Sequence, residues 1–165
     1  MSLIRGKVWK FGDNVNTDAM APGFAFKAPW EELKGLILHI HPRFVREAKP
    51  GDVIVAGKNW GCGSSREHAP ANLKRLGMGC VLAESMARIY FRNSIAVAFP
   101  SLICPGVTDT FGEGDELTLE LETGRVTHVT TGKTLLAEPL SPDMLAIIRA
   151  GGLIASLKAR LQAHT

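Results

Sequence analysis

A glycine-rich turn carrying two adjacent hydroxyls and an arginine is the part of this sequence best suited to bind a small anion. Residues 61–70 read Gly-Cys-Gly-Ser-Ser-Arg-Glu-His-Ala-Pro. Glycines let the backbone come close to a ligand, and the guanidinium of Arg66 offers a planar pair of donors that matches a carboxylate. We therefore expect Ser64, Ser65 and Arg66 to bind a carboxylate, or to hold a serine oxygen as an anion beside one.

The same residues also fit the start of a helix. Ser64 followed three residues later by Glu67 matches a capping box, and Leu73 and Leu76 continue an apolar helical face. The free N–H groups and the positive dipole end of such a helix would stabilise a negative charge. A structural alternative stays open, in which Ser64 is only an N-cap and Arg66 only a surface charge.

The elements around this turn predict an α/β fold. Residues 52–57 form a short β-branched run that is typical of a buried strand, and the helix is expected to follow at Ser64. Further strands are expected at residues 8–11, 79–84 and 101–104, and further helices at residues 30–36 and 87–97.

The pattern changes after residue 115. Residues 116–122 alternate strictly, and glycines at 124 and 132 separate them from short runs at 125–130 and 134–138, which predicts a small antiparallel meander. Ser141 followed by Pro142 predicts a helix start, with that helix reaching Arg149 and a last helix covering 153–161. At 165 residues the chain is expected to form one domain, 1–165.

Two more motifs accompany the glycine-rich turn. Residues 12–18 read Gly-Asp-Asn-Val-Asn-Thr-Asp, and residues 83–93 read Ala-Glu-Ser-Met-Ala-Arg-Ile-Tyr-Phe-Arg-Asn. In this order and spacing the three motifs resemble the small subunits of the isopropylmalate isomerase and homoaconitase group of the aconitase superfamily. The resemblance runs from about Gly6 to the last helix, and it implies the swivelling β/β/α fold of that superfamily.

The resemblance also implies an activity. Such subunits belong to heteromeric hydro-lyases, here of the 3-isopropylmalate dehydratase type, which move a hydroxyl of a substituted malate by dehydration and rehydration. Ser64 maps to the serine base and Asp18 to an active-site aspartate, while Ser65 and Arg66 map to substrate-binding positions. A four-iron four-sulfur cluster, the Lewis acid of the reaction, is expected on a separate large subunit and not on this chain.

Substrate choice in this family depends on the loop after the Thr-Asp pair. Residues 22–29 read Pro-Gly-Phe-Ala-Phe-Lys-Ala-Pro and match neither the isopropylmalate pattern nor the homoaconitase pattern. Phe24 and Phe26 are expected to form an apolar wall against the substrate, while Lys27 stands where homoaconitases place an arginine. We expect Lys27 to face solvent, because an unpaired ammonium beside an alkyl group is costly.

Alternatives to this reading are a homoaconitase-like or methylated-malate dehydratase subunit and a non-catalytic carboxylate-binding or regulatory module. Without the resemblance, Asp18 is equally well explained as a residue of an Asx turn. His68 is expected to pack in the first helical turn rather than to act as a base, and His39 and His41 lack a third ligand for a metal.

Composition argues against several other classes of protein. The net charge of +3 without a basic block does not suggest nucleic acid as a partner. No apolar run approaches 18 residues and no signal-peptide core is present, so we expect a cytoplasmic protein without membrane contact. Cys62, Cys80 and Cys104 are far apart and form no CxxC pair, which suggests neither a disulfide framework nor a metal site.

Overall fold

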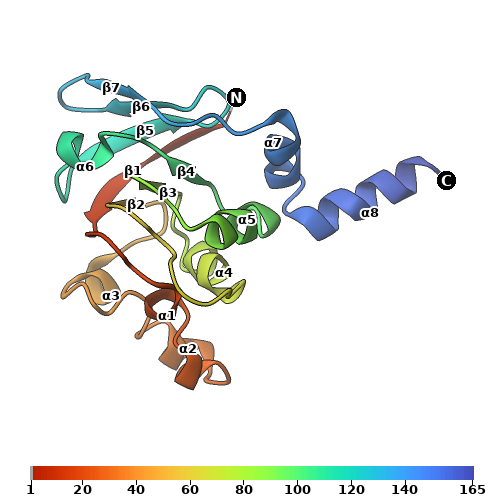
Figure 1. Ribbon diagram of the computed structural model, residues 1–165, viewed down its shortest axis with the longest axis horizontal. Coiled ribbons are helices and arrows are strands. Elements are labelled where there is room, and N and C mark those ends of the chain that lie inside the picture. Colours follow the sequence, from red (N-terminus) through yellow and green to blue (C-terminus); the bar gives the residue numbers. More distant parts are fainter. Residues whose placement is uncertain (1) are drawn as a thin grey trace.

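A seven-stranded mixed sheet forms the centre of the protein, as seen in a computed structural model that describes residues 2–165 (Figure 1). The strand order is β4-β3-β2-β1-β5-β6-β7. The parallel half consists of β1 (Leu3–Lys10), β2 (Val53–Ala56), β3 (Val81–Ala83) and β4 (Ser101–Ile103). The antiparallel half adds β5 (Glu116–Glu120), which pairs with β1, and then β6 (Arg125–His128) and β7 (Thr134–Leu136). The expected α/β class and meander are confirmed.

The two halves of the sheet differ in how their strands are buried. The four residues of β2 are all buried, because both faces of the parallel half are covered. In β5 the buried residues Leu117 and Leu119 alternate with half-buried neighbours, as expected for a strand with one solvated face.

The helices lie on both sides of this sheet. In Figure 1, α1 to α4 lie below the parallel strands, the meander lies above them, and α8 extends away from the rest of the molecule. The helical segments are α1 (Thr17–Met20), the 3₁₀ turn η1 (Gly23–Ala25), α2 (Trp30–Leu33), α3 (Phe44–Glu47), α4 (His68–Arg75), α5 (Arg88–Ala96), α6 (Val107–Thr110), α7 (Pro142–Arg149) and α8 (Leu153–Ala163). No helix within residues 2–165 is long and apolar enough to cross a membrane.

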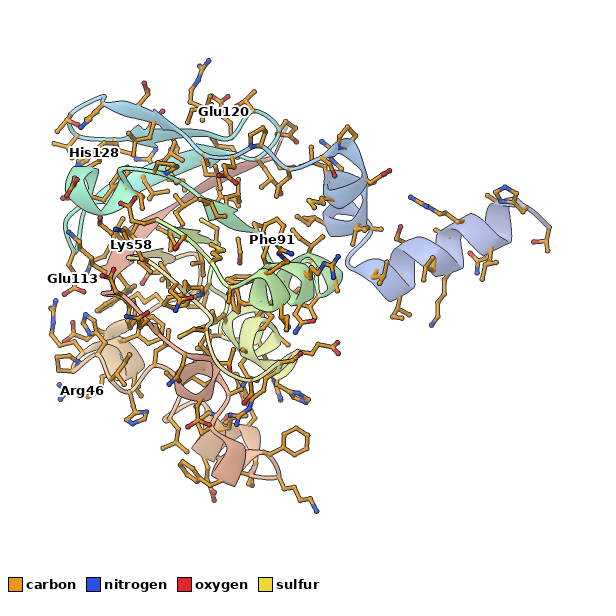
Figure 2. All side chains as sticks on the ribbon, viewed as in Figure 1. Arg46, Lys58, Phe91, Glu113, Glu120 and His128 are labelled. Atoms are coloured by element: carbon orange, nitrogen blue, oxygen red, sulfur yellow. The ribbon has the colours of Figure 1, made fainter. Side chains whose placement is uncertain are left out.

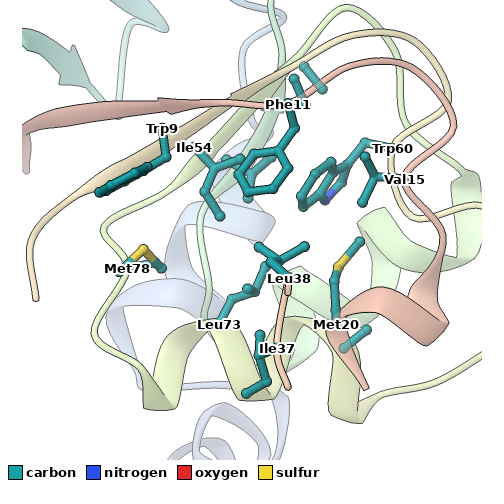
Figure 3. Packing of buried hydrophobic residues seen from close by; sticks show 14 of the residues in the cluster. Trp9, Phe11, Val15, Met20, Ile37, Leu38, Ile54, Trp60, Leu73 and Met78 are labelled. Carbon is teal, nitrogen blue, oxygen red and sulfur yellow. The ribbon is translucent and has the colours of Figure 1, made fainter. Parts of the chain in front are cut away.

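Two apolar cores stabilise the sheet from opposite faces. One core packs large side chains of β1 and β2 against the helices that follow them; Figure 3 displays its centre, with Trp9, Phe11, Ile54, Trp60 and Leu73. The other packs the alternate residues Val8, Val53 and Val55 against β5, β6 and α7. Alternate residues of β1 and β2 therefore feed different cores, which fixes the register of the parallel strands.

Some expected boundaries were wrong for tertiary reasons. Strand β1 begins at Leu3 and not at Val8, because its first residues pair with β5 from Leu3 opposite Glu120 to Lys7 opposite Glu116. Helix α2 ends at Leu33 instead of residue 36, and the chain continues through turns in which Leu36 N–H donates to the Leu33 carbonyl at 2.9 Å. The helix start at Ser141 is confirmed, since its Oγ accepts a hydrogen bond from Met144 N–H at 3.2 Å.

Candidate active site

A cavity of about 300 Å³ lies between the segment that follows α1 and the start of α4. Its lining includes apolar side chains and also hydroxyl, guanidinium, carboxylate, imidazole and amide groups. The lining residues are Ala21, Pro22, Gly23, Phe26, Leu33, Ser65, Arg66, Glu67, His68 and Asn72. The cavity therefore combines an apolar wall with a cationic group, as a ligand with an alkyl part and a carboxylate requires.

Hydrogen bonds to Thr17 hold the glycine-rich loop in place. Thr17 N–H donates to the Cys62 carbonyl at 2.9 Å, and Thr17 Oγ1 donates to the Ser64 carbonyl, also at 2.9 Å. Asn16 and Cys62 form an isolated parallel bridge beside these bonds. The Thr-Asp motif and the Ser-Ser-Arg motif, far apart in sequence, are thereby brought together.

The expectation that Ser64 caps the following helix was wrong. Helix α4 begins at His68, its N-cap position is Glu67, and no side chain makes a cap hydrogen bond there. Two hydrogen bonds from Thr17 instead hold residues 62–64 against the start of α1. Ser64 therefore does not sit in the first turn of α4, and Arg66 is the nearby group available to stabilise an anion.

Arg66 is oriented by two acceptors on the N-terminal segment. Its Nη1 forms an ion pair with Asp18 Oδ1 and donates to the Ala21 carbonyl at 2.7 Å. Asp18 Oδ1 also accepts a hydrogen bond from Gly23 N–H at 3.2 Å. The Arg66 bond, followed by the Gly23 bond, lowers the pKa of Asp18, which keeps this carboxylate charged.

The Nη2 side of the guanidinium lies next to Gly23. A Cβ built on Gly23 would lie 3.4 Å from Arg66 Nη2, so glycine at this position lets the backbone lie close against the guanidinium without a side chain over it. Nη1 is occupied by Asp18 and Ala21, while Nη2 forms no hydrogen bond within residues 2–165. An arginine fixed at one nitrogen in this way is preorganised to bind a carboxylate with the rest of its fork.

Ser64 and Ser65 are exposed at the edge of the cavity. Ser65 belongs to its lining, whereas Ser64 lies next to the lining in the chain and points its hydroxyl to no partner within residues 2–165. Both hydroxyls are therefore free to meet a ligand. They face solvent on a side that this chain does not cover.

The residues expected to form an apolar wall are only partly brought together. Phe26 lines the cavity and packs edge-on against the His68 ring, with centroids 4.7 Å apart. Phe24 is 82% exposed and, like the exposed Lys27, does not line it. The apolar wall is instead completed by Leu33 and Pro22.

Sequence reasoning missed Asn72 and Leu33. Asn72 is a buried polar residue whose Nδ2 donates to the Met20 carbonyl at 3.0 Å, which fastens α4 to α1 beneath the cavity. Its place next to Leu73 on the inner side of a helix was the available signal, because a polar group is buried only where it finds a partner. Leu33 carried no signal beyond its place in an expected helix.

The remaining histidines of interest have other partners. His41 pairs with Glu113, which is labelled in Figure 2 and also bonds Arg43 at 2.8 Å, and the His41 ring packs edge-on against Trp9. His39 Nδ1 lies 2.9 Å from the Leu36 carbonyl. The pair therefore lies in a turn and does not share a strand face.

An iron–sulfur cluster does not fit the cysteines of this chain. Cys80 and Cys104 are fully buried among apolar side chains, and burial raises the pKa of each thiol to about 12, while Cys62 lies half-buried in the glycine-rich loop. No group of three His, Cys, Asp or Glu side chains within the described residues could hold a metal ion. Cys80 instead packs in the second core, as a small apolar residue would.

Comparison with known proteins shows to which family this chain belongs. Residues 40–102 match the Aconitase C-terminal domain family. The small subunit of the isopropylmalate/citramalate isomerase of Methanocaldococcus jannaschii is 48% identical over 97% of this chain and 96% of its own. The small subunits of 3-isopropylmalate dehydratase from Aquifex aeolicus and Thermodesulfovibrio yellowstonii are 44% and 43% identical over similar lengths. The chain belongs to the isopropylmalate dehydratase small-subunit family.

The fold agrees with this family. A crystal structure of a 3-isopropylmalate dehydratase protein from Methanocaldococcus jannaschii matches this one with a TM-score of 0.90 at 37% identity, over 99% of this chain and 98% of the other. The swivel-type α/β architecture expected for isopropylmalate dehydratase small subunits is thereby confirmed. The family match covers the Ser64 loop, while the Thr17–Asp18 segment lies outside residues 40–102 and is covered by the full-length relatives.

Proposed function

We propose that this chain is the small subunit of a heteromeric hydro-lyase of the isopropylmalate dehydratase type. The observation that carries the proposal is the tie between Thr17 and the Ser64 loop, which gathers Ser64, Ser65, Arg66 and Asp18 at one exposed edge of the cavity. Family membership gives the reaction class, and the relatives' names give the subunit role.

In this proposal each residue has a separate role in binding or converting a substituted malate. Arg66 binds a carboxylate through the nitrogens that Asp18 and Ala21 leave free, and Asp18 acts as a positioning residue for that guanidinium. Ser64 Oγ, in its anionic form, takes the proton from the carbon next to this carboxylate. The electron pair of that C–H bond becomes the new carbon–carbon double bond, and the hydroxyl leaves the neighbouring carbon as hydroxide with the electron pair of its C–O bond. The cluster expected on the large subunit would supply the Lewis acid for this leaving group.

A serine anion needs stabilisation at neutral pH. The corrected start of α4 removes the helix terminus as its main source, so the positive charge of Arg66 takes that role. In the reverse direction the same Oγ returns its proton to one carbon while hydroxide adds to the other, which regenerates the serine anion. Ser65 holds the bound carboxylate at the edge of the cavity.

The second half of the site comes from a partner. The four-iron four-sulfur cluster is assigned to a large subunit, because the cysteines of this chain do not suit it and its relatives are named small subunits. The exposed position of Ser64 and Ser65 agrees with a site that another chain covers. We place the complex in the cytoplasm.

The substrate side chain is proposed to be a small alkyl group. Phe26, Leu33 and Pro22 form the apolar wall, and Lys27 lies outside the lining. A homoaconitase-like substrate would require a cation at this wall for its distal carboxylate. The name of the Methanocaldococcus jannaschii relative, which includes both isopropylmalate and citramalate, agrees with alkyl malates as the class.

A hydration assay on the reconstituted complex tests this proposal. The chain is co-expressed with its large subunit, the cluster is assembled anaerobically, and turnover is measured over a panel of alkyl-substituted maleates and tricarboxylic analogues. We expect turnover of the alkyl compounds by the complex and none by the isolated chain, which should also lack cluster absorbance. Turnover by the isolated chain, or a preference for tricarboxylic substrates, would contradict the proposal.

A further inference from the structure

Helix α8 exposes a continuous apolar stripe. In Figures 1 and 2 the helix stands clear of the sheet and of the helices around it. Its four large aliphatic residues are all exposed: Leu153 is 39% exposed, Ile154 66%, Leu157 46% and Leu161 71%. At 3.6 residues per turn these four side chains fall within an arc of about 100°, so they form one face.

Only the beginning of α8 is fixed to the body of the protein. Gly152 lies so close to the end of α5 that an added Cβ would be 2.8 Å from the Ala96 carbonyl oxygen. Ser156 is the one buried residue of the helix. The contact therefore lies on the side of Gly152 and Ser156 and leaves the aliphatic stripe uncovered.

A helix of this kind does not stabilise itself. It has 11 residues, and isolated helices shorter than about 12–15 residues are marginal in water. Most helical stability in proteins comes from burying an apolar face. An apolar face presented on a helix with so little packing of its own is typical of a binding element.

Charge argues that the occupant is a different chain. Residues 144–165 contain no aspartate or glutamate, while Lys158 and Arg160 flank the stripe. Arg149 is already paired with Glu122 at 2.9 Å. A second α8 would bring the same cations against these, whereas an apolar groove with an acidic rim would complement them.

The exposed area of the stripe also argues against a second copy of this chain as the occupant. The four aliphatic residues present roughly 400 Å² of accessible surface, so two copies joined through α8 alone would bury about 800 Å², below the about 1,200 Å² of specific stable interfaces. A large subunit that also covers the exposed edge of the cavity adds this stripe to a larger contact. We propose that α8 docks its Leu153–Ile154–Leu157–Leu161 stripe into an acid-rimmed apolar groove of the large subunit. This inference rests on the proposed function, which supplies that subunit.

The test compares two aspartates placed on the same helix. Leu157→Asp puts a charge in the middle of the stripe, and Ala159→Asp puts the same charge on the opposite side; both positions are exposed. Ile154→Asp serves as a second stripe variant. Far-UV circular dichroism and thermal unfolding of the isolated chains establish that all three fold like the wild type.

The dissociation constant of each variant for the purified large subunit is measured by biolayer interferometry, and turnover is titrated against small-chain concentration. We expect Leu157→Asp and Ile154→Asp to raise the dissociation constant at least about tenfold, with Ala159→Asp unchanged. At saturating small chain all variants should reach the same kcat, because α8 carries no residue of the cavity.

The outcomes separate the two proposals. If the wild type binds the large subunit and the stripe variants bind it equally well, the docking inference is wrong while the proposed function stands. If the isolated wild type is a dimer by light scattering and Leu157→Asp makes it a monomer, the stripe serves a second copy and the inference is likewise overturned. If the wild type does not bind the large subunit at all, the proposed function itself fails.

Discussion

Arg66 is held by this chain before any ligand arrives. Its Nη1 is shared between Asp18 and the Ala21 carbonyl, and Asp18 is itself fixed by Gly23 N–H. From these contacts we propose that Asp18 aims the guanidinium rather than taking part in proton transfer. At the residue scale, the site is therefore a preorganised cation beside two free hydroxyls.

Replacing Asp18 tests this positioning role. Asp18→Asn removes the charge that holds Arg66 while keeping an acceptor for Gly23, so we expect KM to rise about tenfold and kcat to change less. The measurement is steady-state kinetics of the reconstituted complex.

Asp13→Asn is the matched control, because Asp13 is another loop aspartate whose Oδ1 accepts a backbone hydrogen bond, from Lys58 N–H at 2.7 Å, outside the cavity. It should leave KM unchanged. If Asp18→Asn instead slows turnover by about two orders of magnitude or more at constant KM, Asp18 takes part in the chemical step.

At the scale of elements, the loop between β2 and α4 is fixed from two sides. Thr17 holds it through two hydrogen bonds, and Gly61 rests on Tyr90 of α5. Gly61 has a φ of 77°, and a Cβ there would lie 2.3 Å from Tyr90 Cγ. The position of the loop thus depends on the packing of Gly61 against α5.

Alanine at Gly61 should destabilise the protein more than alanine at Gly63. Both glycines have positive φ, but a Cβ on Gly63 meets its nearest atoms at an ordinary 3.6 Å. We expect Gly61→Ala to lower the free energy of unfolding by about 1–3 kcal/mol more than Gly63→Ala does, which is the range for overpacking. Urea denaturation measures both, and equal losses would mean that the backbone conformation alone decides.

The ion pair between α7 and the end of β5 predicts a pH dependence. Arg149, followed by the backbone N–H of Ser2, lowers the pKa of Glu122 to about 2. Because the unfolded value is about 4.3, the stabilisation is complete above that pH and is lost as the pH falls toward 2.

The measurement is the difference in free energy of unfolding between the wild type and Glu122→Gln, taken by urea denaturation across this range. The difference should be constant above about pH 5.5 and should shrink between about pH 4.5 and 2. A difference that persists unchanged at pH 2 would show that the charge of Glu122 is not its source.

Local pattern and tertiary contact determine which elements could be predicted from the sequence. The alternation in 116–122 and the Ser141-Pro142 pair are local signals, and the strand and the helix start that they predict are present. The capping pattern at Ser64 is equally local, yet bonds from Thr17, 47 residues away, override it. The first half of β1 also escaped prediction, because its partner β5 lies far along the chain.

At the scale of the whole molecule, the cavity lies on the side of the sheet that carries α1 and α4. The edge of the cavity, at Ser64 and Ser65, is exposed. The family resemblance, and not periodicity, indicated that Ser64, Arg66 and Asp18 belong together, and the structure brings Arg66 and Asp18 into contact. Phe24 was assigned to the apolar wall by an ungapped loop comparison, yet it does not line the cavity. Lys27 is exposed and lies outside the lining, in agreement with the expectation that it faces solvent. We propose that this chain carries half of the site and acts only with a partner.

The central claim is that Ser64 acts in the reaction, and Ser64→Ala in the reconstituted complex tests it most directly. Because Ser64 caps no helix, the substitution should change the free energy of unfolding by less than about 0.5 kcal/mol. It should lower kcat by about 10²–10⁴, the range for a lost general base. Ser141→Ala is the control, since it removes a real N-cap and should cost about 1 kcal/mol of stability at unchanged kcat. A Ser64→Ala complex that keeps wild-type kcat would contradict the account.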